Sequence, residues 1–116
     1  MTDTELTRAL ERGALPAGTF HHLDHLRVAL VYLNESATVP DAIECMAATL
    51  QRFASAAGQP DKFSRPVTEF WMYQMAAARA MMPHATADAL VAAWPRLLDK
   101  TARGGTARRT AARRWR

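Results

Sequence analysis

The chain has 116 residues, a length that fits one domain and excludes a multidomain architecture. Hydrophobic residues make up 49% of it and charged residues 22%, which excludes the composition of a disordered chain. The single cysteine, Cys45, excludes an internal disulfide framework and a cysteine-based zinc knuckle.

The net charge of +4 is concentrated at one end of the chain. Residues 1–100 hold nine Lys and Arg against eleven Asp and Glu, whereas residues 101–116 add six Arg and no acid. We therefore predict a single helical domain over residues 1–100 and a basic tail over residues 101–116. The tail has one large apolar residue, Trp115, so we expect it to be disordered or to form a frayed helix with a stripe of Arg residues.

The N-terminal residues carry acids where a signal peptide would carry cations, and no apolar stretch follows them. No uncharged apolar run approaches the roughly 20 residues that span a bilayer. We expect a cytoplasmic protein with no membrane association. The apolar pattern of the fourth predicted helix also allows a homodimer in which a second copy of the chain covers that helix.

The apolar residues recur at helical spacing almost throughout. A first short helix is predicted to begin at a cap formed by Asp3 or Thr4 and to end near Arg12. A second is predicted over residues 20–34, where one stripe contains a set of histidine and apolar residues: His22, His25, Leu26, Ala29 and Leu33.

The third helix is predicted to begin after Thr38 and to end before Gly58, with Met46, Leu50 and Phe53 on its apolar stripe. A fourth, capped by Ser64, carries so many apolar residues that we expect it to be the most enclosed. Thr86 is predicted to cap a fifth, short helix that Pro95 ends. Strand signals are absent, so the predicted fold class is an all-α bundle of four main helices plus short ones.

Three of the four histidines, His21, His22 and His25, fall within five positions. On a helix, the rings of His22 and His25 share a face and can converge on one point, a spacing that suits a divalent transition metal. The alternative is that the pair caps the helix or bonds an exposed backbone group. Zinc needs three or four protein ligands, and further donors are available: His21, Glu44, Cys45, Glu69 and His84.

Glu69 stands in the first turns of the otherwise apolar fourth helix. Pointing inward, it would serve as a metal ligand or as a general base with a raised pKa. Pointing outward, it would be an exposed acid favoured by the helix dipole. We take His22, His25 and Glu69 as the candidate catalytic and metal-binding set. The Met-rich, aromatic interior could instead admit a flat apolar ligand.

Three segments resemble a family of small bacterial all-helical proteins: residues 20–29 (FHHLDHLRVA), 62–68 (KFSRPVT) and 94–100 (WPRLLDK). That family pairs an F-x-H-x-x-H-like helix start with a later K-[YF]-H-E-T-x-T segment, and the resemblance covers about residues 6–100. It implies a helical fold and a site near His22 and His25. Ser64, Arg65 and Pro66 stand where the family carries His, Glu and Thr, so half of the implied site differs here.

Three functions follow from these patterns. The first is a metal-dependent or histidine-based enzyme of small-molecule metabolism, with a pocket near His22 and His25. The second is a non-catalytic helical module that binds a ligand or a protein. The third is nucleic-acid association through the Arg-rich tail, which would be sensitive to salt and largely independent of sequence.

Overall fold

The computed structural model describes residues 1–99 and is all-α, as predicted, with no strand in that range. Its helices are α1 (Asp3–Glu11), α2 (His22–Glu35), α3 (Val39–Ala56), α4 (Arg65–Met81) and α5 (Ala87–Ala93). Three short 3-10 turns, η1 (Ala17–Thr19), η2 (Pro60–Lys62) and η3 (Pro95–Leu98), lie in the connections and after α5. The basic tail predicted for residues 101–116 lies outside the described residues. None of the helices within residues 1–99 is long and apolar enough to cross a membrane.

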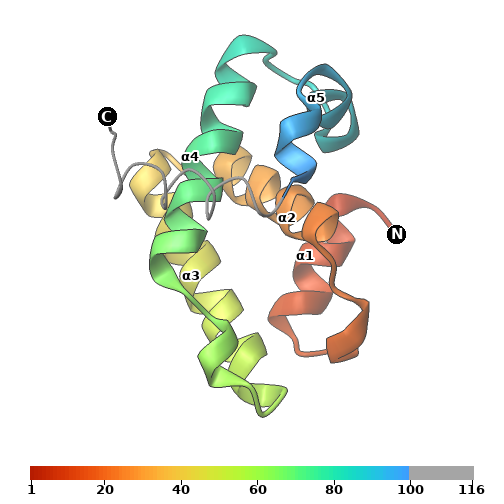
Figure 1. Ribbon diagram of the computed structural model, residues 1–116, viewed down its shortest axis with the longest axis vertical. Helices are drawn as coiled ribbons and strands as arrows, with labels where there is room; N and C mark the ends of the chain where they lie inside the picture. The colour runs from red at the N-terminus through yellow and green to blue at the C-terminus, as the bar shows by residue number, and fades with distance from the viewer. Residues whose placement is uncertain (100–116) are drawn as a thin grey trace.

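Helix α2 occupies the middle of the fold (Figure 1) and packs against α1, α3, α4 and α5. Leu26 and Val28 are fully buried, and the run from Ala29 to Leu33 is at most 8% exposed. Helix α4, predicted to be the most enclosed, instead leaves Tyr73 and Met81 exposed. That prediction is wrong because α4 lies at the side of the bundle, so its apolar residues cannot all face a neighbour.

Hydroxyl side chains begin four of the five helices. Thr38, Ser64 and Thr86 cap α3, α4 and α5 as predicted, each accepting a hydrogen bond from the backbone N–H three residues later. Helix α1 is capped by Thr2 and not by Asp3 or Thr4, because the Thr2 hydroxyl and the Glu5 carboxylate form a reciprocal capping box.

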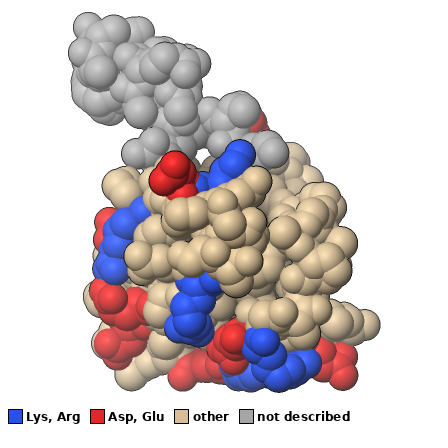
Figure 2. Space-filling model, turned by 90° about the horizontal axis from the view of Figure 1, so that it is seen from below, with Lys and Arg blue, Asp and Glu red and all other residues tan. Residues whose placement is uncertain are grey.

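Two arginines fix the ends of α2. Near its start, Arg27 forms ion pairs with Asp24 and with two acids of neighbouring helices, Asp3 of α1 and Asp88 of α5. At its end, Arg79 of α4 donates to the Leu33 carbonyl (2.6 Å), one of the carbonyls that a helix end leaves without a helical partner. On the face shown in Figure 2, acidic and basic residues lie mainly along the left and lower edges, and the centre and right of this face are largely uncharged.

A polar cluster around the buried Tyr32 and Thr49 joins α1, α2 and α3, with Glu11 and Arg8 partly exposed at its edge. The Tyr32 hydroxyl, on a residue only 4% exposed, donates to the Glu11 carboxylate and accepts from the Thr49 hydroxyl at 2.8 Å. Arg8 forms an ion pair with the same carboxylate (3.0 Å). Burial, together with the hydrogen bond to Glu11, raises the pKa of Tyr32 above its ordinary value. The cluster therefore holds the tyrosine in its neutral form.

Removing the hydroxyl in Tyr32→Phe should lower the free energy of unfolding by about 1–3 kcal/mol, because Thr49 and Glu11 lose a partner in a buried place. The matched control is Tyr73→Phe on the exposed part of α4, which should change stability by less than about 0.5 kcal/mol. Urea unfolding followed by circular dichroism measures both. Equal values for the two variants would contradict the role of the cluster.

The raised pKa of Tyr32 also sets an alkaline limit on stability. Above about pH 10 the unfolded chain loses the tyrosine proton while the folded chain keeps it, so the folded state binds more protons. The contribution of Tyr32 is therefore fully present below about pH 10 and is lost as pH rises further. Between about pH 8 and pH 11, the free energy of unfolding should fall more steeply with pH for the wild type than for Tyr32→Phe. Parallel curves would refute the assignment.

Candidate functional site

A pocket of about 270 Å³ opens between α2, α3 and α4. Its walls come from the apolar stripes predicted for the second and third helices: His22, His25, Leu26 and Ala29 from α2, and Met46, Leu50, Phe53 and Ala54 from α3. Helix α4 closes the remaining side with residues that include Ser64, at its cap, and Thr68, Trp71 and Met72. The two histidines therefore lie at one pocket.

His22 is held on two sides. Its Nε2–H donates to the backbone carbonyl of Leu97 in η3 at 2.8 Å, and its ring packs edge-on against the Trp71 indole with centroids 4.7 Å apart. Since a carbonyl can only accept, Nε2 carries the proton and Nδ1 carries the lone pair of the neutral ring. Contacts from two other segments, η3 and α4, thus fix the orientation of this imidazole, and the hydrogen bond to Leu97 selects its tautomer.

His25 belongs to an aromatic wall. Its ring lies 4.3 Å from that of Phe20, centroid to centroid, and Phe20 in turn meets Phe53 of α3 edge-on at 5.5 Å. All three side chains line the pocket and are partly buried. The wall gives one side of the pocket flat, apolar faces beside a single polar imidazole.

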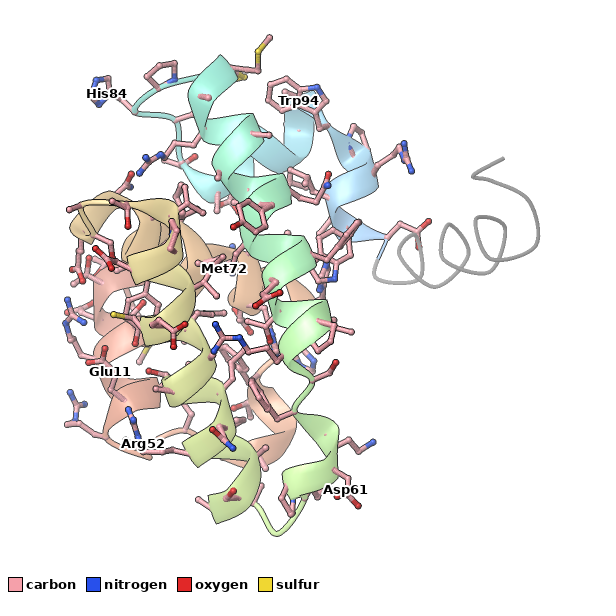
Figure 3. All side chains as sticks on the ribbon, turned by 90° about the vertical axis from the view of Figure 1, so that its left-hand side faces the viewer. Glu11, Arg52, Asp61, Met72, His84 and Trp94 are labelled. Carbon is pink, nitrogen blue, oxygen red and sulfur yellow. The ribbon has the colours of Figure 1, made fainter. Side chains whose placement is uncertain are left out.

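The lining residues of the pocket differ in burial. Gln59 and Lys62, from the connection between α3 and α4, line it and are exposed, so they mark its mouth. Leu26, Ala29 and Met72 line it and are at most 2% exposed, so they form its floor. Figure 3 shows Met72 in the middle of the molecule. Asp61, which precedes Lys62 in the chain, lies at one end of the long axis of the molecule. The pocket therefore runs from a polar mouth to an apolar floor.

Glu69, the predicted third donor, is turned away from the pocket. Its carboxylate accepts from Arg65 Nε at 2.9 Å, its side chain is 43% exposed, and it is not a lining residue. Arg65 also donates to Glu44 of α3 (Nη1–Oε1 3.2 Å), and these hydrogen bonds lower the pKa of Glu44. The inward orientation of Glu69 is thus corrected, because Arg65 binds both carboxylates on the outer side of α3 and α4.

The other predicted donors are also outside the pocket. His21, Cys45 and His84 are exposed, and Glu44 is held by Arg65. Within residues 1–99, no group of three or more His, Cys, Asp or Glu side chains is arranged to hold a metal ion. The structure brings His22 and His25 to one pocket but does not bring a third such donor to them.

A second, more open groove of about 480 Å³ lies on the other side of Trp71. It runs between α4 and the α5–η3 segment and is lined by aromatic and small residues that include Phe70, Trp94 and Ala77. Arg96 is the charged residue among those that line it. Trp71 is shared by the two hollows, and the His22–Leu97 hydrogen bond joins their walls.

Several pocket residues were not identified as site residues from the sequence. Phe20 and Lys62 belong to the family-like segments over residues 20–29 and 62–68, and this was the signal available for them; Phe53 was predicted only as part of an apolar stripe, and Trp71 lies three positions beyond the second segment. The Leu97 carbonyl carried no such signal, since any residue has a carbonyl and this one lies 75 positions from His22.

Comparison with known proteins adds no constraint to this geometry. Neither the family models, nor the curated proteins, nor the solved structures include a match to the chain, so the functional conclusion depends on the pocket itself.

Proposed function

We propose that the protein binds a small, mainly apolar molecule in the pocket between α2, α3 and α4. The observation that carries the proposal is the pocket itself, with an apolar floor, an aromatic wall and a few polar groups near its mouth. Concave sites of this composition are typical of small-molecule recognition, in which apolar walls supply affinity and a few polar groups supply orientation.

The volume limits the size of the ligand. A cavity of about 150 Å³ accommodates benzene, so about 270 Å³ corresponds by proportion to roughly eleven non-hydrogen atoms. A molecule of this size is one aromatic ring with a short chain, or an aliphatic chain of medium length. The packing of His22 against Trp71 and of Phe20 against Phe53 gives the site preformed flat walls, which reduces the ordering cost of binding.

Ala57, exposed at the end of α3, lines the mouth of the pocket, and its neighbour Ala56 is exposed without lining it. Ala57→Phe should place a ring across the entrance and weaken binding of the neutral probe 3-phenylpropan-1-ol at least about tenfold. Ala56→Phe, the matched control, should leave the affinity unchanged. Two-dimensional NMR titration measures both, and the backbone signals of Leu26, Ala29 and Leu50 report on the pocket, since these residues line it and do not line the second groove.

Two results would refute the proposal. One is the absence of saturable shifts at pocket residues for any apolar probe of this size. The other is a titration in which Trp94 responds and residues of the α2–α3 wall do not, since Trp94 lines the second groove alone.

A histidine-based enzyme is the second candidate, and the fixed tautomer of His22 favours it. The Leu97 carbonyl holds Nε2–H, which leaves Nδ1 as the nitrogen that can accept a proton from a bound molecule. An imidazole oriented in this way through its other nitrogen is the usual arrangement of a histidine general base.

Spectra of the protein labelled with ¹⁵N-histidine test this second candidate. The base role requires the Nε2–H tautomer at His22 and a shift of its Nδ1 resonance when the hydroxyl donor 3-phenylpropan-1-ol binds. The signal is assigned by its loss in His22→Gln. A proton on Nδ1, or an Nδ1 resonance that stays fixed while the pocket fills, would rule the base role out.

A further inference from the structure

We infer that the ligand is an anion, a small aromatic or aliphatic carboxylate whose acid group meets Lys62 at the mouth of the pocket. This inference rests on the proposed function and specifies the ligand class. It follows from three features of the described residues: the state of Lys62, the placement of the nearby acids and the burial gradient of the walls.

Lys62 carries a positive charge that no side chain balances in the part of the chain that the structure describes. It lines the pocket, it is exposed, and none of the ion pairs or hydrogen bonds within residues 1–99 involves its ammonium group. The neighbouring Asp61 is exposed and does not line the pocket. An ammonium group at the rim of an apolar pocket attracts a ligand that brings its own negative charge.

The acids that could repel an anion are held elsewhere. No Asp or Glu is found among the pocket-lining residues in the described chain. Arg65, which follows the lining residue Ser64, binds Glu44 and Glu69 on the outer side of α3 and α4. The remaining polar groups of the lining, Gln59, Ser64, Thr68 and the two histidines, bring no negative charge. The walls therefore carry no negative charge.

The burial gradient fixes the orientation of the ligand. The floor, formed by residues such as Leu26, Ala29 and Met72, contains no charge partner, so an ionised group placed there would lose its hydration without compensation. The apolar end must therefore enter first, between the aromatic wall and Trp71. The acid group then remains at the mouth, where it meets Lys62 and stays partly hydrated.

Two probes of matched size test the inference: 3-phenylpropionate, an anion, and its neutral amide, 3-phenylpropanamide. The wild type should prefer the carboxylate by about fivefold at low ionic strength, the range expected for an exposed ion pair. The preference should shrink between about 20 mM and 300 mM salt. NMR titration gives both dissociation constants.

Lys62→Gln should abolish the preference by weakening only the carboxylate, and binding of the amide should stay unchanged. The control variant is Arg12→Gln, which removes one positive charge from an exposed residue outside the pocket and should leave the preference intact. Neither substitution removes a buried side chain, so both variants keep the folded core.

The outcomes separate the two claims. Equal binding of both probes, or a carboxylate preference that survives in Lys62→Gln, overturns the anion assignment and leaves the proposed function standing. Failure of both probes to bind overturns the proposed function and this inference with it. A carboxylate preference lost in Lys62→Gln and kept in Arg12→Gln supports both.

Discussion

The burial of α2 is the constraint on which the rest of the structure depends. Its residues from Leu26 to Leu33, apart from Arg27, are withdrawn from water, and burying each large apolar side chain contributes about 1.5–3 kcal/mol. Because apolar residues surround this part of the helix, it can be covered only if other helices pack on every side. Helices α1, α3, α4 and α5 do so, and their positions follow from that requirement. Tyr32 adds a polar fixed point, since its hydroxyl must reach Glu11 and Thr49 together.

The pocket is the place where this covering is incomplete. Along the N-terminal part of α2 the side chain of Ala29 is small, and the rings of Phe20 and His25 pack against each other at the pocket wall, so α3 and α4 enclose a hollow there without filling it. Leu30 and Leu33, further along the helix, belong to the core without lining the pocket, whereas Leu26 and Ala29 belong to the core and line the pocket as well. The same helix thus serves as the packing centre from Leu26 to Leu33 and, over its N-terminal part, also as a wall of the pocket.

The sequence was informative wherever a local pattern decides the structure. Helical spacing alone placed His22, His25, Leu26 and Ala29 on one face, and that face lines the pocket. Hydroxyl residues before apolar runs identified the caps of α3, α4 and α5. In these cases the determining interactions lie within a few residues of one another, so periodicity and capping chemistry are sufficient.

The sequence was uninformative where partners come from distant segments. Whether Glu69 faced inward depended on Arg65, one turn away, and the position of Arg65 depended in turn on Glu44 of another helix. Similarly, α2 is more enclosed than α4 because more helices pack against it. The apolar pattern of one helix does not give the number of helices that will pack against it. Spacing on a helix determines which residues share a face. It does not determine which residues an ion pair with another helix will hold on the solvent side.

The hydrogen bond between His22 and Leu97 has a consequence for the order in which the molecule is built. It joins positions 75 residues apart, and closing so long a loop costs more chain entropy than forming the helix pairs that are neighbours in sequence. During synthesis, η3 is the last of the described elements to leave the ribosome. The imidazole of His22 is therefore unanchored on that side until nearly all of residues 1–99 have emerged. The four longer helices can assemble before then, whereas the tautomer of His22 is selected only at the end.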